Sequence, residues 1–360
     1  MFNKYQATTD QIKVVEHEID ITDQFTTDCF DSVNAEVDRL SRIGDDYYSE
    51  GDNPIDRKRT SKIDMNNPAT REMLDTYPSF NQWLAMVPTA AALEPLYDPN
   101  CPRLADGTLI DTPSSEWFKN IADARGMRSR AEVMKGILKD EAVSAVAPQR
   151  WISLACGAAQ PVFSVLESLR EEGILLPSVT LADLDKNALS LTERYAQEHS
   201  MGEHITTKRL NILQRGGLTY ERQTGAAGVA RSALLRLRGR LPAESFDAVD
   251  AVGILEYLKR PDWKFNYKNV VTTTKKMAGA ETFLRNAYDL VKPGGILVVG
   301  NMLDTHPQLG FTLNVIQWPH IQPRSVEEMT NIIKTVGING QVDVYKPSDG
   351  VYAIYGIRKP

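Results

Sequence analysis

The residues best suited to chemistry begin in the run WISLACGAAQPVF, at positions 151–163. An apolar, strand-like stretch is followed by small residues and then by Pro161, which is favoured in the first turn of a helix. Ala155, Gly157 and Ala159 lack bulky side chains, so a ligand could approach the backbone and accept hydrogen bonds from N–H groups at the helix N-terminus. A single glycine is equally typical of a plain tight turn.

An acidic residue follows the next strand-like run. The sequence VTLADLDKNAL places Asp183 26 positions after Gly157. An acid at the end of the second strand can accept hydrogen bonds from both hydroxyls of a ribose. Asp183 or Asp185 could instead cap the following helix. We assign ribose binding to Asp183 and the helix cap to Asp185.

From Trp151 onward, apolar runs alternate with helical patterns, which is typical of a parallel α/β sheet. With a late helix over 325–337 and a hairpin signal at 341–359, the pattern predicts an α/β fold with a doubly wound, seven-stranded sheet that ends in a C-terminal β-hairpin. Residues 1–145 show polar helical pieces, so we expect an N-terminal helical lid or substrate region there and the sheet domain over 146–360. The five crossing strands are expected at 151–155, 178–184, 205–211, 246–253 and 295–302.

Five motifs in this order resemble those of the class I S-adenosylmethionine-dependent methyltransferases. The resemblance covers about residues 125–360 and implies a Rossmann-like domain that binds S-adenosyl-L-methionine. The motifs are SLACGAAQPV (153–162) for the glycine-rich turn, VTLADLDKNAL (179–189) for the acidic strand end, LNI (210–212) near the adenine, FDAVDAVGILEYL (246–258) for the fourth motif, and AYDLVKPGGILVVGNM (287–302) for the last helix, turn and strand.

The resemblance also assigns parts of the cofactor to particular strand ends. The turn should line the methionine and ribose, the second strand end the ribose and one adenine face, the third the adenine edge, and the fourth the sulfonium. The turn residues are Ala155, Gly157 and Ala158, and the second strand end supplies Asp183 and Leu184. The third strand end supplies Asn211 and Ile212, and the fourth supplies Val252 and Gly253. Asn211 could instead only close a turn.

The chain departs from the family pattern at the first strand. Ser153 stands in place of an acid that usually helps to hold the methionine ammonium, so Glu256 or an N-terminal residue would have to replace it. Upstream, ARGMRSRAEVMKGIL resembles the helix that precedes the first strand in many of these enzymes. Arg128 or Arg130 could reach the methionine carboxylate, because arginine binds carboxylates in a bidentate manner. Both could also be solvated arginines of a helix surface.

Catalytic groups are harder to identify, because methyl transfer from an activated sulfonium depends mainly on positioning. A base is needed only where the acceptor loses a proton. Glu256, Asn301 and His306 lie at the expected edge of the sheet and are the polar candidates, although a lone loop histidine is often a bystander.

Aromatic faces attract a sulfonium through cation–π interactions. Tyr267 is the candidate for this role, with Trp263 and Phe265 in the same insert after the fourth strand. Tyr77 and Trp83 in TYPSFNQWL are the alternative. Either group could also form an ordinary hydrophobic lid.

Composition narrows the partners. The net charge of −6 and the absence of a known RNA-binding module argue against nucleic acid, so we read the arginines of 214–244 as a solvated helix face or an oligomer contact, which leaves a homodimer open. A polar N-terminus, three unpaired cysteines and no apolar run of about 20 residues predict a cytoplasmic protein without a membrane partner. The five histidines lack ligand spacing, so we expect no metal.

Together these features predict S-adenosylmethionine-dependent methyl transfer to a small-molecule acceptor, with the N-terminal helices excluding water. Two alternatives stay open at this stage. One is chemistry at the aminocarboxypropyl arm, as in azetidine-2-carboxylate-type cyclisation or nicotianamine-type transfer, which releases methylthioadenosine. The other is a non-catalytic, cofactor-binding regulatory subunit.

Overall fold

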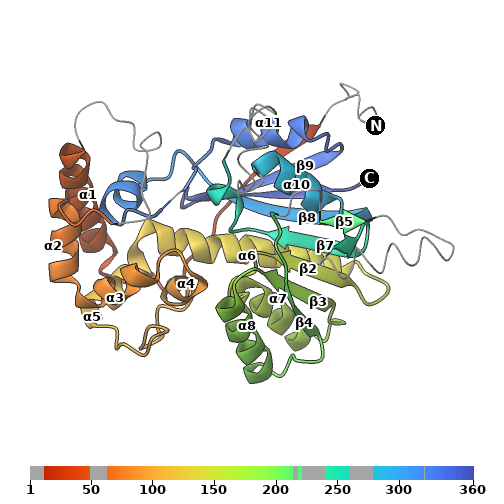
Figure 1. The fold of residues 1–360 in the computed structure, drawn as a ribbon, viewed down its shortest axis with the longest axis horizontal. Helices are drawn as coiled ribbons and strands as arrows, with labels where there is room; N and C mark the ends of the chain where they lie inside the picture. The colour runs from red at the N-terminus through yellow and green to blue at the C-terminus, as the bar shows by residue number, and fades with distance from the viewer. Residues whose placement is uncertain (1–11, 49–62, 214–217, 221–239, 260–278, 320) are drawn as a thin grey trace, which may run out of the picture.

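An eight-stranded sheet organises the molecule, with the strand order β1-β9-β10-β8-β7-β2-β3-β4 (Figure 1). The computed structural model describes residues 12–48, 63–213, 218–220, 240–259, 279–319 and 321–360. The sheet strands are β1 (Lys13–Ile19), β2 (Arg150–Leu154), β3 (Ser178–Asp183), β4 (Ile205–Arg209), β7 (Phe246–Ala251), β8 (Val291–Met302), β9 (Gln341–Pro347) and β10 (Tyr352–Arg358). A separate two-stranded sheet pairs β5 (Thr219–Tyr220) with β6 (Leu241–Pro242).

The predicted α/β class and each of the seven predicted strands are confirmed, but the strand count is wrong. The eighth strand, β1, comes from the N-terminal region that was expected to be helical, and it pairs in parallel with β9 from Lys13↔Gln341 to Ile19↔Pro347. Its sequence KVVEHEI carries charges that an edge strand tolerates and a buried strand does not. Lys346 of β9 forms ion pairs with Glu16 and Glu18 of β1.

Helices cover both faces of the sheet. The helices α6 (Ala122–Val143), α7 (Gln160–Glu171) and α8 (Lys186–Glu198) lie on one face, and α10 (Ala280–Tyr288) and α11 (Val326–Thr335) lie on the other (Figure 1). Two apolar cores result, because alternate residues of each strand point to opposite faces. Gly126 of α6 packs closely against the residue before β10, because a Cβ atom there would lie 2.4 Å from the Val351 side chain.

The other N-terminal helices form a bundle at the far end of α6 (Figure 1). They are α1 (Phe30–Tyr47), α2 (Pro68–Thr76), α3 (Pro78–Met86), α4 (Ala90–Tyr97) and α5 (Thr112–Asn120), joined by the late segment η3 (Phe311–Val315). Aromatic rings fill the interior of this bundle. Tyr77 packs on Trp117 with centroids 4.5 Å apart, and Trp83 packs on Trp318 at 6.0 Å.

This packing corrects the expectation that Tyr77 and Trp83 could shield a sulfonium. Trp83 is fully buried, and its indole N–H donates to the Ala92 carbonyl. Both rings are structural, because the bundle has an aromatic core of its own that the sequence pattern did not reveal. Among the described helices of this bundle, α4 supplies residues to the cavity at the strand ends where a ligand would bind.

Candidate functional site

The turn between β2 and α7 has an unusual backbone. Ala155, Gly157 and Ala159 have φ angles of 52°, 55° and 57°, in the left-handed region that favours glycine. An alanine there costs roughly 1–2 kcal/mol, and such strain tends to be retained where function requires it. The three positions at which the sequence predicted a need for small residues are therefore the three that adopt this conformation.

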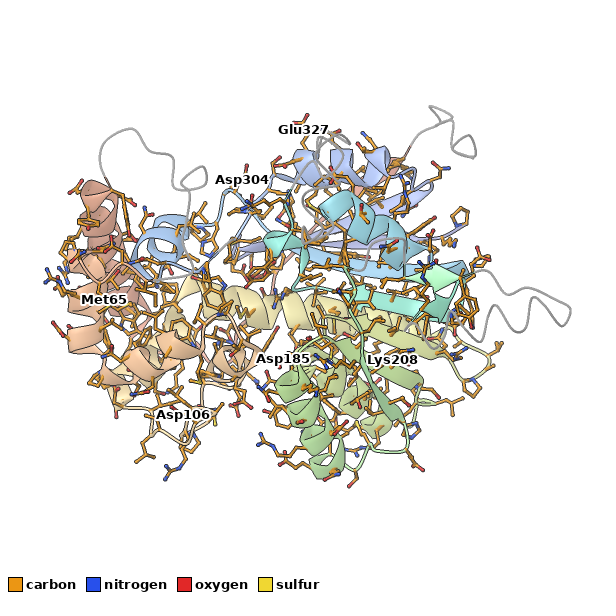
Figure 2. The ribbon with its side chains drawn as sticks, in the orientation of Figure 1. Met65, Asp106, Asp185, Lys208, Asp304 and Glu327 are labelled. Atoms are coloured by element: carbon orange, nitrogen blue, oxygen red, sulfur yellow. The ribbon has the colours of Figure 1, made fainter. Side chains whose placement is uncertain are left out.

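Asp183 lies beside the turn, at the end of β3. Its Oδ2 accepts a hydrogen bond from the Gly157 N–H at 3.0 Å, and its Oδ1 accepts one from the Asp185 N–H at 2.9 Å. Asp185 in turn caps α8, since its carboxylate accepts the Asn187 N–H at 2.9 Å. Figure 2 labels Asp185 at the start of this helix. The predicted helix cap is thus confirmed, and the Asp183 carboxylate is at the strand end where a ribose was expected.

The predicted adenine neighbours have different environments. Leu184 is 52% exposed although it is apolar, so it can pack against a ligand face. Asn211 is exposed, and its Oδ1 accepts the Leu213 N–H at 3.1 Å, which is the turn-closing role considered as the alternative. Ile212 is buried in the core that lies under α10 and α11.

A cavity of about 80 Å³ opens directly onto the turn. Its walls include the turn itself, the end of β7 at Val252 and Gly253, and the α4 residues Ala90, Leu93 and Tyr97. Small-molecule sites usually enclose roughly 300–1,000 Å³, so a whole nucleoside cofactor needs α4 to move outward. The contact is close, because a Cβ atom on Gly157 would lie 3.4 Å from Ala90 Cβ.

A buried acid that the sequence did not reveal also lines this cavity. Asp250 of β7 is 5% exposed, and its Oδ1 accepts the Ser153 hydroxyl at 2.7 Å. Burial raises the pKa of Asp250 to about 7, while the hydrogen bond from Ser153 opposes this rise. Asp250 looked like the interior of an apolar strand in FDAVDAVG, and only the pairing of β7 with β2 shows that it lies beside Ser153.

The two candidate arginines of α6 point to different places. Arg130 lines the cavity, and it donates from Nη1 to the Val252 carbonyl at 3.1 Å and from Nη2 to the Tyr97 hydroxyl at 2.8 Å. Arg128 does not reach the turn. All its N–H groups are engaged by the Asp23 carboxylate and by three carbonyl groups, which belong to Leu96, Phe118 and Lys119.

Glu256 lies near the Arg130 guanidinium, in the short helix η1 (Leu255–Tyr257) that follows β7. Its Oε1 is 3.7 Å from Arg130 Nη1, and its Oε2 has no hydrogen-bond partner in the part of the chain that the structure describes. Burial raises the pKa of Glu256 to about 7, although Arg130 and Arg324 oppose the rise. A carboxyl group of this kind is suited to accept a proton near neutral pH.

The remaining catalytic candidates are arranged differently. Asn301 is buried and fully engaged, since its amide donates to the Met302 and Gln322 carbonyls and accepts from Arg324 Nη1 at 2.7 Å. His306 is buried with Nδ1 accepting the Gln308 N–H at 2.9 Å. Tyr267, Trp263 and Phe265, together with most of the arginine-rich insert, lie outside the described residues.

A larger hollow of about 970 Å³ runs along the outer side of α6. It lies between residues 19–25, which begin at the last residue of β1, and the outward surface of α7. Tyr97, Gln160 and Pro161 border both cavities. We place the functional site at the smaller cavity, because ligands of open α/β sheets bind at the carboxyl ends of the strands.

Two further observations concern metals and membranes. In the described ranges, no group of three or more His, Cys, Asp or Glu side chains has the geometry to hold a metal ion. None of the helices described is both long enough and apolar enough to cross a membrane.

No protein-family model and no curated protein matches the chain. A possible exported protein from Bordetella parapertussis superposes with a TM-score of 0.57 at 14% identity, covering 91% of this chain and 97% of that one. Magnesium protoporphyrin IX methyltransferase from Synechocystis, with bound S-adenosylhomocysteine, gives 0.45 at 10% identity over 80% and 98% of the two chains. An O-methyltransferase family protein from Burkholderia thailandensis gives 0.41 at 15% identity over 80% and 70%. At these identities the similarity concerns the fold.

Proposed function

We propose that the chain transfers a methyl group from S-adenosyl-L-methionine to a small-molecule acceptor. The observation that carries this proposal is that a buried cation and a buried acid line the same cavity as the turn. Arg130 and Asp250 line the same cavity as the backbone of 155–159. The amino-acid end of the cofactor carries a carboxylate and an ammonium, which these two side chains complement.

Other residues suit the nucleoside end. The Asp183 carboxylate is the acceptor for two ribose hydroxyls, and the exposed Leu184 offers an apolar surface to one adenine face. The backbone at Gly157 supplies the close approach, because its positive φ and missing Cβ leave room that a larger residue would fill. The residues at this edge therefore fit the cofactor in chemistry, once α4 has moved.

The bound cofactor supplies an already activated methyl group. The chain would contribute orientation, since fixing two reactants in line can supply about 7–11 kcal/mol of the barrier. The buried surroundings of Val252 would exclude water from the sulfonium and strengthen every charge interaction there. The Cys156 thiol, also in the cavity, is no competing nucleophile, because burial holds its pKa well above the ordinary range.

The by-product tests this proposal directly. Attack at the methyl carbon leaves S-adenosylhomocysteine, whereas attack at the aminocarboxypropyl carbon leaves methylthioadenosine. We expect purified protein to form S-adenosylhomocysteine only when the small-molecule fraction of a cell extract is added, with mass spectrometry identifying the nucleoside. Enzyme-dependent methylthioadenosine from the cofactor alone would establish the cyclisation chemistry instead. Binding without any turnover would favour the regulatory role.

A further inference from the structure

Besides Gln160 Oε1, whose residue lines the cavity at the turn, four buried polar atoms near the candidate site have no hydrogen-bond partner among the described residues. They are Arg130 Nε, Glu256 Oε2, His306 Nε2 and Tyr352 Oη. They come from α6, from η1, from the loop after β8 and from β10. More than nine in ten buried polar groups in proteins find a partner, so several in one place call for an explanation.

Arg130, Glu256 and Tyr352 form one cluster, and His306 is linked to it through Asp123. The Arg130 guanidinium lies over the Tyr352 ring, 4.5 Å from its centroid, and 3.7 Å from Glu256 Oε1. His306 Nε2 lies 3.5 Å from Oδ1 of Asp123, which is two helical turns before Arg130 on α6. The charges of Asp123 and Arg130 act on both Glu256 and Tyr352, as expected for groups that share one buried volume.

The position of this cluster suggests what its missing partner is. Glu256 follows β7 and His306 follows β8, so both lie at the edge of the sheet where the turn and Asp183 also lie. The cluster also shares Arg130 with the cavity at the turn. A polar molecule held here would lie beside the Arg130 side chain and next to the cavity proposed for the cofactor.

We propose that this cluster is the acceptor subsite, and that the acceptor is a small molecule with an O–H or N–H nucleophile whose proton passes to Glu256. The inference rests on the proposed methyl transfer. In the step, a lone pair of the acceptor atom forms the bond to the methyl carbon, and the carbon–sulfur bond breaks with its electron pair left on sulfur. The proton moves to Oε2 of Glu256.

Hydrogen bonding distinguishes Glu256 from the other polar candidates as the proton acceptor. Because Nδ1 of His306 accepts the Gln308 N–H, the proton of the neutral ring is on Nε2, which makes this atom a donor. The amide of Asn301 is fully engaged. Arg130 Nε, His306 Nε2 and the Tyr352 hydroxyl are therefore donors that can hold an oxygen atom of the acceptor, and Glu256 is the group that can take its proton.

The charges that surround Glu256 are known from the structure. Arg130 and Asp123 face it from α6, Arg324 from the segment before α11, Tyr257 from η1, and Tyr352 from β10. Arg324 is occupied by the carbonyls of Leu255 and Leu258 and by Asn301. A new positive charge at the reacting centre should therefore act on Glu256 with little compensation from groups that can rearrange.

The test compares S-adenosylmethionine with S-adenosylhomocysteine, which differ by one positive charge at sulfur. The infrared band of the protonated Glu256 carboxyl group is followed from pH 5 to 9. The band that disappears in Glu256→Gln is assigned to Glu256, and the band that disappears in Asp250→Asn, measured without ligand, is assigned to Asp250. A unit charge about 8 Å away, at an effective dielectric constant of about 20, lowers the midpoint by roughly 1.5 pH units. We expect the midpoint of Glu256 to be at least one pH unit lower with S-adenosylmethionine.

The possible outcomes separate the two proposals. Equal midpoints in the two complexes would overturn the acceptor subsite and leave the cofactor proposal standing. Failure of either nucleoside to bind in calorimetry would refute both. In the extract assay, Glu256→Gln should bind S-adenosylhomocysteine within threefold of the wild type and lose about 100-fold in turnover, in the range typical of a lost base.

A second variant separates catalysis from folding. Tyr352→Phe removes only the unpartnered hydroxyl and keeps the ring under Arg130. We expect it to raise the KM for the acceptor while kcat changes little, because this hydroxyl is proposed to hold the acceptor and takes no proton. An unchanged KM would remove Tyr352 from the subsite.

Discussion

Asp250 and Ser153 lie opposite each other in the parallel pairing of β7 with β2, and the Ser153 hydroxyl donates to Asp250 Oδ1 at 2.7 Å. In the family that the motifs resemble, the acid that helps to hold the methionine ammonium comes from the strand that corresponds to β2. Here the carboxyl group comes from the neighbouring strand and reaches the same cavity. The serine thus donates a hydrogen bond to a buried acid on the neighbouring strand.

The burial of Asp250 predicts opposite effects on stability and on cofactor binding, because the neutral carboxyl group favours the fold and the charged one favours binding. The folded pKa of about 7 lies above the unfolded value of about 3.9, so the neutral carboxyl stabilises the fold at low pH. That contribution is lost as the pH rises from about 4 to about 7. Asp250→Asn cannot ionise, so we expect its Tm to exceed that of the wild type by a few degrees at pH 8 and to differ little at pH 4.

The same variant should bind S-adenosylmethionine at least tenfold more weakly at pH 8, because the ammonium loses its charged partner. Scanning and titration calorimetry measure the two effects. Asp247→Asn, at the opposite end of β7 and paired with Lys292, is the control and should bind normally. Unimpaired binding by folded Asp250→Asn would exclude Asp250 from the site.

A second prediction concerns Asp183. Its carboxylate is proposed to accept two ribose hydroxyls, each worth roughly 1.5–3 kcal/mol. Asp183→Ala should therefore weaken S-adenosylhomocysteine binding at least tenfold by calorimetry. Asp185→Ala removes only the helix cap two residues away and should cost about 1 kcal/mol of stability with near-normal binding. If both variants bind alike, the carboxylate of Asp183 has no part in the site.

A third prediction tests the strained turn. Ala155 has a positive φ and Ala158 does not, so Ala155→Gly should raise the free energy of unfolding by about 0.5 kcal/mol, whereas Ala158→Gly should lower it. Gly157→Val should abolish cofactor binding, because its side chain would meet Ala90 and the approaching ligand. Denaturant titrations measure the stabilities. A destabilised Ala155→Gly would show that the turn stores no strain.

The sequence predicted the central strands because parallel strands buried on both faces are continuous apolar runs. The edge strand β1 was missed, since its Glu16, His17 and Glu18 are typical of an exposed segment. Asp185 was predictable as the helix cap from its spacing alone, because a cap must immediately precede its helix. These signals are local, and local signals are visible in one sequence.

Relationships between distant segments were not predictable in this way. Arg128 and Arg130 are two residues apart on one helix, so they point to different sides of it, and only the packing of α6 decides which one meets the turn. Asp250 reads as the interior of a strand until β7 is paired with β2. The role of α4 likewise depends on contacts with α6 and α8 that no motif encodes.

The last prediction follows from those contacts of α4. The cavity of about 80 Å³ is too small for the cofactor while Ala90 and Tyr97 cover the turn. Side-chain hydrogen bonds hold α4 in place: the Tyr195 hydroxyl of α8 donates to Glu94, and Arg130 donates to Tyr97. Trp83 and Arg128 also donate to the carbonyls of Ala92 and Leu96. Since Arg130 is also the proposed partner of the methionine carboxylate, the cofactor and the Tyr97 hydroxyl compete for one guanidinium.

Loosening α4 should therefore favour binding. When only a fraction of the molecules is in the conformation that can bind, the apparent affinity is reduced by that fraction. Tyr195→Phe removes one hydrogen bond, worth about 1 kcal/mol, and keeps the ring packed on Phe163. In stopped-flow measurements we expect S-adenosylhomocysteine to associate roughly fivefold faster with this variant. Tyr288→Phe, on α10 and remote from α4, is the matched control and should leave the rate unchanged. Equal association rates for wild type and Tyr195→Phe would show that α4 does not limit entry to the turn.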